Sequence, residues 1–493
     1  MIKLKKLLRD LPVEVKGSKD IEISGICSNS KLVAPGCLFI AQPGNADDGS
    51  KYIGEAIEAG AVAIATDMYN PFFKGIVQLI YPNIRALEPL LADRYYDAPS
   101  KELFLVGITG TNGKTTSSYL IKHLLDALNM PSGLIGTIDY IVGETRYRAS
   151  LTTPDAITNQ RLLREMVHQG CRAAVMEVSS HGLNQKRVEG LLYDVAIFTN
   201  LTQDHLDYHK TMEEYATAKA LLFKSLTREK SGRAPCALIN GDSPAADRMV
   251  AECQAQVTRY GIDKPADIRA THLSASVEGT HFQVTYEGHS APFFVPFVGR
   301  HNVYNCLTAI GVGLCLGLPL TQLATILATA PAVAGRLEMV PNQLGLHVFV
   351  DFAHSDDGLI NVLSTLKPLC KGRLLVVFGA GGDRDKAKRP KMAAACEAGA
   401  DYCIVTSDNP RSEDPEAIIR DICSGFRFSN HMMEVDRRTA IDKALSLAHP
   451  GDFILIAGRG HETVQKFHGT AIDFSDREVT AALCRAREEI AVS

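Results

Sequence analysis

The chain has 493 residues, enough for about three domains at roughly 100–200 residues each. Its composition, 46% hydrophobic and 22% charged, is ordinary for globular domains that each bury a core. The formal net charge is −4 and the sequence has no long basic run, which argues against a nucleic-acid surface. The sequence also contains no run of about 18 apolar residues, so no membrane span is predicted.

The cysteines and the N-terminus indicate the cellular compartment. Twelve cysteines are spaced singly without a CxxC pair, and no apolar stretch at the N-terminus is long enough for a signal peptide. We therefore expect reduced, mostly buried thiols in a cytoplasmic protein.

Residues 1–97 form the first predicted domain, a small α/β unit. The apolar runs at 37–41 and 61–65 are typical of buried strands, and residues 52–59 have helical spacing of apolar side chains. The polar stretch 95–100 indicates the exit from this domain.

Residues 98–333 form the second predicted domain. A strand at 103–108 runs into a glycine-rich loop, a helix is predicted at 115–128, and strands are predicted at 173–178 and 194–199. This alternation predicts an α/β fold with a mostly parallel sheet and helices on both faces. Period-two apolar spacing within 266–298 adds a small β extension, an antiparallel hairpin.

Residues 334–493 form the third predicted domain, again α/β. Strands are predicted at 346–351, 374–378, 402–406 and 453–457, with helices between them. The order of these elements resembles a dinucleotide-fold domain.

The glycine-rich loop predicts a nucleoside triphosphate site. It consists of Gly110, Thr111, Asn112, Gly113, Lys114, Thr115 and Thr116. Glycines let the backbone turn its N–H groups toward phosphate oxygens, the lysine supplies a cation, and Thr115 supplies a hydroxyl for Mg²⁺. Ile108 stands where the longer motif has glycine, so the match is to the short GxxGKT form, for which the alternative is an ordinary glycine turn.

Two further polar segments follow strands of the second domain. Glu177 lies at a strand end, where a carboxylate can hold Mg²⁺, although a helix-capping acid is the alternative. His205 belongs to a segment with two Asp and two His in six residues, which predicts a second metal contact or, alternatively, a polar surface loop. Lys219 is, on its sequence context alone, one solvated lysine of an amphipathic helix.

Three polar turns follow three strands of the third domain. They occupy residues 379–385, 407–411 and 458–462, and Arg384 is placed to hold a carboxylate by a bidentate fork. Each turn alone is an ordinary turn, but together they predict one substrate site at the strand ends.

Seven motifs in order resemble the Mur ligases, ATP-dependent amide-forming enzymes of peptidoglycan synthesis, and are most similar to the diaminopimelate-adding members. They are GTNGKTT from Gly110, TTPD from Thr152, MEVSSHGL from Met176, NLTQDHLDYH from Asn200, GRHNVYN from Gly299, GRLE from Gly335 and DNPR from Asp408. The resemblance covers all three domains. It implies ATP and Mg²⁺ as cofactors, UDP-MurNAc-L-Ala-D-Glu and meso-diaminopimelate as substrates, and a monomeric enzyme of cell wall biogenesis that joins the two through an acyl phosphate.

The resemblance also implies roles for individual residues. The nucleotide-sugar dipeptide would be bound by Ser28, Ser30, Asn45, Ala46, Asp47, Thr152, Thr153, Ser179, Gln185 and Arg187. ATP would contact the loop together with Asn302, Arg336, Asp351 and His354. Thr115, Glu177, His205 and a carbamylated Lys219 would serve the metals, and Lys114, Lys219, Glu177 and His205 the catalysis. The diamino acid would be bound by Arg384, Asp408, Asn409, Pro410, Arg411, Gly458 and Glu462.

The DNPR motif indicates the amino acid. Arg411 is a fork-shaped cation suited to the second carboxylate of meso-diaminopimelate, which lysine lacks, and Glu462 would pair with the distal ammonium. The chain departs from the family pattern at Leu151, where an Asn is common, and at Phe352 and Asp356, which replace a Tyr and a Pro. We expect modest effects from these departures.

Other functions remain open at this point. A different Mur-type ligase or a folylpolyglutamate synthetase shares the chemistry, although the first domain and the DNPR turn argue against the folate enzyme. A phosphate-loop switch or motor would leave the third domain unexplained. A catalytically inactive binding module is disfavoured by the presence of Lys114, Glu177 and Lys219.

Overall fold

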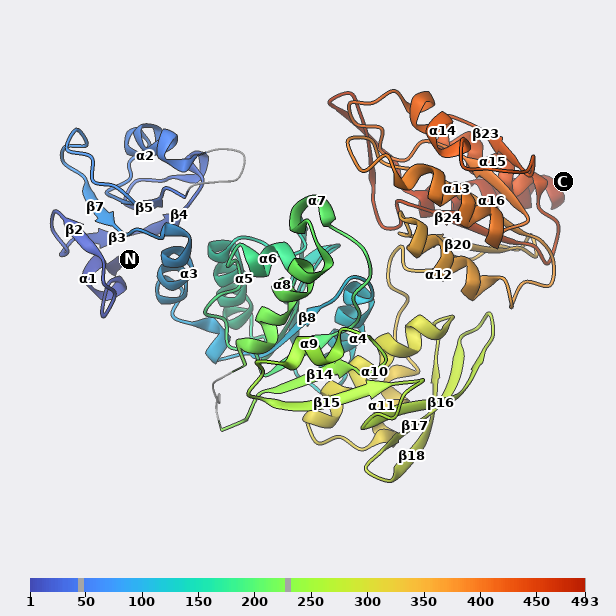
Figure 1. Cartoon of the computed structure of the whole chain (residues 1–493), viewed down its shortest axis with the longest axis horizontal. Coiled ribbons are helices and arrows are strands. Elements are labelled where there is room, and N and C mark those ends of the chain that lie inside the picture. Colours follow the sequence, from blue (N-terminus) through green and yellow to red (C-terminus); the bar gives the residue numbers. More distant parts are fainter. Residues whose placement is uncertain (43–47, 227–231, 493) are drawn as a thin grey trace. The chain divides into compact units, whose positions relative to one another are not determined.

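The computed structural model describes residues 1–42, 48–226 and 232–492, and the chain forms two compact units (Figure 1). The first comprises Met1–Ala270, Val284–Ala291 and Tyr304–Ile326, and the second comprises Thr271–Gln283, Pro292–Val303 and Leu327–Ser493. The domain boundaries expected at 97/98 and 333/334 stay predictions.

The N-terminal part of the first unit has a five-stranded sheet of order β2-β7-β6-β5-β4. Its strands are β2 (Glu14–Lys16), β4 (Gly25–Cys27), β5 (Cys37–Ile40), β6 (Ala63–Thr66) and β7 (Val77–Ile80). The last four are parallel, and β2 pairs antiparallel with β7. The helices are α1 (Leu4–Leu7), α2 (Ile53–Glu58) and α3 (Ile84–Tyr95), and β1 (Ile2–Lys3) pairs with β3 (Glu22–Ile23). The strands predicted at 37–41 and 61–65 and the helix predicted at 52–59 are confirmed.

The large sheet has the order β11-β10-β9-β12-β8-β13-β14-β15-β16-β17-β18. Seven neighbouring strands, from β9 to β16, are parallel: β9 (Ser132–Ile135), β12 (Ala173–Glu177), β8 (Phe104–Thr109), β13 (Val195–Phe198), β14 (Cys236–Asn240), β15 (Gln256–Gly261) and β16 (Ile268–Ala275). The antiparallel strands β10 (Asp139–Val142) and β11 (Thr145–Arg148) lie at one edge. Segment 266–298, where a hairpin was expected, contains β16, β17 (Thr280–Tyr286) and β18 (His289–Val295).

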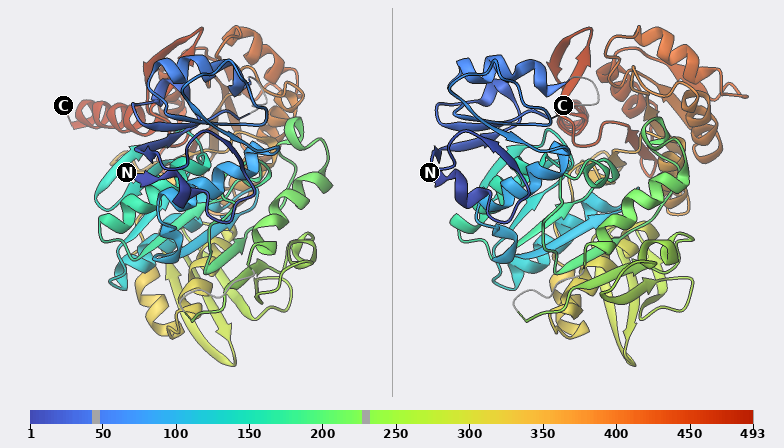
Figure 2. Two further views of the ribbon diagram at one scale, coloured as in Figure 1. Left: turned by 90° about the vertical axis from the view of Figure 1, so that its left-hand side faces the viewer. Right: turned by 60° about the vertical axis from the view of Figure 1, so that its left-hand side comes forward.

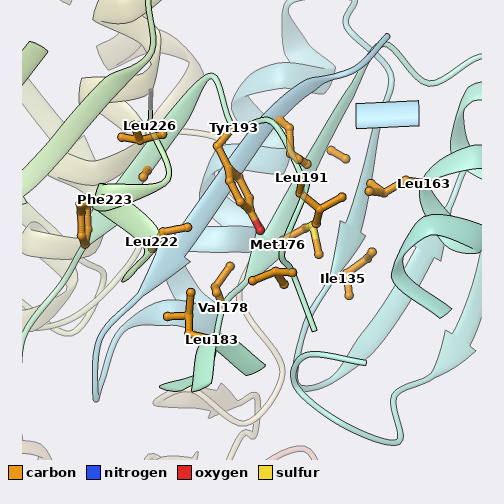
Figure 3. Packing of buried hydrophobic residues seen from close by; sticks show 14 of the residues in the cluster. Ile135, Leu163, Met176, Val178, Leu183, Leu191, Tyr193, Leu222, Phe223 and Leu226 are labelled. Carbon is orange, nitrogen blue, oxygen red and sulfur yellow. The ribbon is translucent and has the colours of Figure 1, made fainter. Parts of the chain in front are cut away.

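Helices cover this sheet and bury its apolar residues. They are α4 (Lys114–Ala127), α5 (Ala156–His168), α6 (Ser180–Asn184), α7 (Leu206–His209), α8 (Met212–Lys224), α9 (Ala246–Val250), α10 (Arg300–Cys315) and α11 (Leu320–Leu327). Figure 3 shows part of the core, a cluster of buried side chains that includes Leu163, Met176, Tyr193 and Phe223. Each such buried side chain stabilises the fold by about 1.5–3 kcal/mol, so this layer holds the strand ends in place.

The second unit has a six-stranded sheet of order β19-β20-β24-β21-β22-β23. The strands are β19 (Glu338–Val340), β20 (His347–Asp351), β21 (Leu374–Phe378), β22 (Tyr402–Val405), β23 (His431–Met433) and β24 (Phe453–Ala457), all parallel except β19. A separate hairpin joins β25 (Val464–Phe467) to β26 (Thr470–Asp473). The four strands predicted here from sequence are confirmed.

Helices lie on both faces of the second sheet, as a dinucleotide-type fold requires. One buried cluster includes side chains of α12 (Asp356–Leu366), α13 (Lys388–Gly399) and α14 (Pro415–Cys423), and the other includes side chains of α15 (Arg437–Leu447) and α16 (Asp476–Val492). The long helix α16 can be followed to the C-terminus in Figure 2. None of the helices in the described ranges is long and apolar enough to cross a membrane.

Candidate active site

The glycine-rich loop joins β8 to α4 and is held by residues that follow β13. Gly110 has φ +150°, and a Cβ there would lie 1.9 Å from Thr199 Oγ1, so this position admits only glycine. Thr199 Oγ1 donates to the carbonyl of Asn112 at 2.6 Å, and the backbone N–H of Asn112 donates to Asn200 Oδ1 at 2.8 Å. The loop is therefore fixed before any ligand arrives.

Two lysine ammonium groups meet at one carbonyl of this loop. Lys114 Nζ and Lys219 Nζ each lie 2.9 Å from the oxygen of Gly110. Lys219 is only 1% exposed and lies 4.4 Å from the centre of the Tyr215 ring. Burial, together with repulsion from Lys114, holds the pKa of Lys219 well below its usual value. The expectation of a solvated Lys219 is therefore wrong, because α8 packs this side chain against a loop more than a hundred residues away in sequence.

Glu177 ends β12 and is completely buried beside the loop. Its Oε2 accepts hydrogen bonds from Thr115 Oγ1 at 3.0 Å and from Thr137 Oγ1 at 2.9 Å, and its Oε1 accepts from the N–H of Thr137 at 3.0 Å. The helix-capping alternative is wrong, since Ser179 caps the following helix. Sequence reasoning missed Thr137, which is a single threonine with no local signal.

The oxygens at this end of the sheet fit a hard divalent cation. Thr115 Oγ1 and Glu177 Oε2 are the hydroxyl and carboxylate ligands that Mg²⁺ prefers. His205 is half-exposed, with φ +55°, and its ring lies 5.0 Å from that of His181. In the part of the chain that the structure describes, no three His, Cys, Asp or Glu side chains are grouped to hold a metal. The metal roles of Thr115, Glu177, His205 and Lys219 therefore stay predictions.

The five dipeptide-binding residues predicted in the second domain lie together next to Glu177. Thr153 Oγ1 accepts from the N–H of Ser179 at 2.9 Å, and Arg187 donates to the Thr153 carbonyl at 2.8 Å. A second guanidinium nitrogen of Arg187 donates to Gln185 Oε1 at 2.6 Å. Thr152 Oγ1 lies 3.1 Å from Thr137 Oγ1, so one hydrogen-bonded network joins these residues to the buried carboxylate.

A cavity of about 250 Å³ opens beside this network. Its lining includes three cations, Arg85, Lys186 and Arg187, and two carboxyl side chains, Glu88 and Asp155. An excess of positive charge in a concave site favours an anionic substrate.

The N-terminal residues predicted to bind the nucleotide lie elsewhere. Ser30 donates to Glu55 Oε2 at 3.0 Å, and Ser28 lies two residues before it, but neither lines the cavity. The predicted contacts Asn45, Ala46 and Asp47 lie outside the described residues.

In the second unit, three predicted nucleotide contacts gather around Phe352. The Arg336 guanidinium lies 4.8 Å from the Phe352 ring centre, and the His354 and Phe352 rings are also 4.8 Å apart. Asp351 ends β20 and accepts from the N–H groups of Leu337 and Ala353. Phe352 lacks the hydroxyl common in relatives, but its ring face still supports Arg336.

The fourth predicted contact, Asn302, lies on α10, where its side-chain amide donates to the Val298 carbonyl at 2.9 Å. Asn305, one turn later, was not predicted. A Cβ at Gly113 would come 2.5 Å from Asn305 Oδ1, which therefore lies against the phosphate loop.

The turns after β22 and β24 in the second unit meet, as predicted. Asn409 Nδ2 donates to Glu462 Oε2 at 2.7 Å, and a Cβ at Gly458 would lie 2.6 Å from Asp408 Oδ2. Burial, followed by repulsion from Asp408, raises the pKa of Glu462. Asp408 and Glu462 are thus a pair of acids suited to an ammonium group, although the charges of Arg459 and Lys466 also act on Glu462.

The turn after β21 contributes Arg384 and lies against Arg411 of the turn after β22. A Cβ at Gly381 would lie 3.5 Å from Arg411 Nη1 and 3.9 Å from Arg384 Cγ, so the two arginines flank this glycine. Arg411 has φ +55°, donates through its side chain to the Gly382 carbonyl, and follows Pro410. The exposed Arg384 and the half-buried Arg411 together offer guanidinium donors to a carboxylate.

Buried ion pairs beneath these turns were not predicted. Arg437 and Asp476, both 0% exposed, form a bidentate pair at 2.7 Å, and Arg437 also donates to the carbonyls of Ser407 and Ala457. Arg389, 1% exposed, binds Glu413 at 2.9 Å. Arginines within helix sequences usually indicate a solvated surface, so no local pattern reveals these pairs.

Family models match three successive segments of the chain. The Mur ligase family catalytic domain matches residues 22–86, the Mur ligase middle domain residues 108–313, and the Mur ligase glutamate ligase domain residues 335–460. This chain belongs to the Mur ligase family. The enzyme class is therefore an ATP-dependent ligase that forms amide bonds, and the family predicted from seven motifs is confirmed.

Full-length Mur ligases resemble this one throughout. It is 46% identical to a UDP-N-acetylmuramoyl-L-alanyl-D-glutamate–2,6-diaminopimelate ligase of Chlamydia caviae, over 97% of this chain and 98% of the relative. The ligase of the same name from Caldanaerobacter subterraneus is 40% identical over 99% and 100%. A solved structure of that ligase type superposes with a TM-score of 0.71 at 32% identity and covers 99% of both chains. A folylpolyglutamate synthase of Mycobacterium tuberculosis shares the fold at 21% identity, with a TM-score of 0.63 over 80% of this chain and 93% of the synthase.

Proposed function

We propose that this Mur ligase joins meso-2,6-diaminopimelate to the D-glutamate side-chain carboxylate of UDP-MurNAc-L-Ala-D-Glu, in cytoplasmic peptidoglycan precursor synthesis. The carboxylate oxygen attacks the γ-phosphorus of ATP, ADP leaves, and an acyl phosphate forms. The free amine then attacks the acyl carbon, phosphate leaves, and one proton is released. The full-length similarity to ligases of that name supports this activity.

The phosphate loop and Lys114 bind the triphosphate and offset the charge where one anion meets another. Thr115 and Glu177 would hold Mg²⁺, which would supply charge neutralisation at the phosphates. The lowered pKa of Lys219 supports carbamylation, because only an uncharged amine adds CO₂ with loss of a proton. The product is an anion, which is better suited to a metal site than an ammonium group.

One observation carries the choice of amino acid: Arg411 and Arg384 flank Gly381, and the turn that contains Arg411 also contains Asp408 and the Asn409 that donates to Glu462. The arginines bind the distal carboxylate of the diamino acid, and Glu462 pairs with its distal ammonium. Lysine would satisfy Asp408 and Glu462 but leave both arginines without a carboxylate.

Purified protein with ATP, Mg²⁺ and UDP-MurNAc-L-Ala-D-Glu tests the proposal, with meso-diaminopimelate or L-lysine as the acceptor. We expect phosphate release and the tripeptide product with meso-diaminopimelate and little with L-lysine. A preference for lysine would contradict the role of Arg411. Phosphate release that does not depend on the added amino acid would contradict ligation and favour a phosphate-loop NTPase.

A further inference from the structure

Glu88 is a buried acid whose placement the ligase chemistry described above leaves unexplained. It lies in the second turn of α3, is 2% exposed, and lines the cavity that also contains Arg85, Asp155 and Arg187. Among the described residues its Oε2 has no hydrogen-bond partner. Asp93, on the same helix, has a partner, since it accepts from Gln160 Nε2 at 3.2 Å. A buried polar oxygen without a partner costs free energy, and such atoms are rare in folded proteins.

The surroundings of Glu88 favour its protonated form. Burial raises its pKa to about 8, repulsion from Asp155 adds to the rise, and attraction to Arg187 and Arg85 opposes it. Asp155 is fixed at the N-cap of α5, where it accepts from the N–H of Thr158 at 2.8 Å. Lys186 faces the same cavity but is paired with Glu189 at 2.8 Å. The carboxyl group is therefore neutral near pH 7 and has a proton to donate.

We propose that Glu88 is a substrate-binding residue whose neutral carboxyl donates a hydrogen bond to an oxyanion of the bound nucleotide-sugar peptide. This rests on the proposed function, which supplies a substrate with diphosphate and carboxylate oxyanions. Three cations attract such a substrate into the cavity, and an ionised acid among them would repel it. A neutral carboxylic acid that lines the cavity can instead donate a hydrogen bond to the oxyanion.

Binding of UDP-MurNAc-L-Ala-D-Glu without ATP, measured by calorimetry from pH 6.5 to 9, tests this contact. If only the protonated form binds, the wild-type Kd rises about tenfold between pH 7 and pH 9, because the competent fraction falls above pH 8. Glu88→Gln keeps a donor and an acceptor but cannot ionise, so it should bind at pH 7 within about twofold of wild type and lose this rise. Glu58→Gln, an exposed acid on α2, is the control and should follow the wild type.

Weaker binding by Glu88→Gln at pH 7 would show an ionised, accepting Glu88 and overturn the proposal. So would identical pH profiles for the variant and the wild type. Binding is measured without ATP or amino acid. The binding result can therefore be interpreted even if the ligation experiment fails.

The pH dependence of folding stability tests whether Glu88 is protonated, without any ligand. The folded chain holds a proton on Glu88 up to about pH 8, whereas the unfolded chain releases it near the ordinary value of 4.5. The folded state thus binds more protons between these limits, so the wild type loses stability relative to Glu88→Gln as pH rises from about 4.5 to 8, with no further change above. A melting-temperature difference with this profile but no change in binding would show a buried acid that does not touch substrate, and would overturn the proposal.

UDP-N-acetylglucosamine, which has the diphosphate but no carboxylate, identifies the oxyanion. A Glu88-dependent pH profile with this ligand assigns the contact to the diphosphate. A profile seen only with the dipeptide substrate assigns it to a carboxylate of the lactyl-peptide part.

Discussion

The phosphate loop of the first unit and the turn cluster of the second unit differ in which charged residues are buried. The turn cluster consists of the turns at 379–385, 407–411 and 458–462. At the phosphate loop the side chains proposed to act in catalysis are themselves buried: Glu177 is 0% and Lys219 1% exposed. In the turn cluster Arg384 is exposed and Arg411 half-buried, while the buried charges lie beneath them in the Arg437–Asp476 and Arg389–Glu413 pairs. In the first region the side chains proposed to contact ligand are buried, and in the second the buried charges lie beneath the side chains proposed to contact ligand.

Under the proposed function, the difference follows from the ligand of each site. A triphosphate and its metal would need fixed, buried charges, where electrostatic interactions are strong. A small zwitterionic amino acid would have to enter and be recognised by its charged ends, so the side chains proposed to contact it stay accessible. Four substitutions, from the largest expected effect to the smallest, test this comparison.

Arg437→Met removes the support of the turn cluster and leaves Asp476 as an uncompensated buried charge. We expect it to lower the free energy of unfolding of the second unit by about 3–5 kcal/mol. Urea unfolding measures this change, and the exposed neighbour Arg438→Met is the control. A change no larger than that of the control would mean that the buried pair does not support the turns.

Lys219→Ala removes the buried amine beside the phosphate loop. We expect ligation to fall roughly 100–1000-fold with little change in folding, as for loss of a preorganised charged group. Added acetate or formate should restore part of the rate by replacing the carbamate. Lys224→Ala, an exposed lysine on the same helix, is the control. Unchanged activity in the Lys219 variant would remove this residue from the site.

Arg411→Ala removes one accessible contact of the turn cluster. We expect kcat/KM for meso-diaminopimelate to fall roughly 10–100-fold, because a charged hydrogen bond contributes about 1.5–3 kcal/mol, while the KM for ATP stays constant. Steady-state kinetics with each substrate varied separates the two. Arg420→Ala, exposed and paired with Asp414, is the control. Equal loss for ATP and the amino acid would contradict the assigned role.

The smallest effect concerns Glu462 and pH. Its raised pKa means that it protonates at higher pH than an ordinary glutamate, and only its anion pairs with the distal ammonium. We expect the KM for meso-diaminopimelate to rise several-fold as pH falls through this pKa, and to become flat with pH in Glu462→Gln. A wild-type KM that is independent of pH would indicate that Glu462 does not bind the ammonium.

The phosphate loop could be predicted because the residues that define it are contiguous in the sequence. Gly110, Gly113 and Lys114 lie within five residues, and the flanking strand and helix show ordinary apolar periodicity. The turns at 379–385, 407–411 and 458–462 could be predicted as one site because parallel strands end on the same edge of a sheet. Lys219, Thr137 and Glu88 could not, because each is a single residue whose partners are distant in sequence.

The sequence by itself determined the family, the α/β class, the phosphate loop and the DNPR motif, since periodicity and ordered motifs are local properties. Only the tertiary structure decided the ionisation of individual groups. It buries Lys219 against Gly110, buries Glu88 within the electrostatic influence of Asp155, and pairs Arg437 with Asp476. Burial and neighbouring charge set a pKa, and both arise from contacts between segments that the linear sequence keeps far apart.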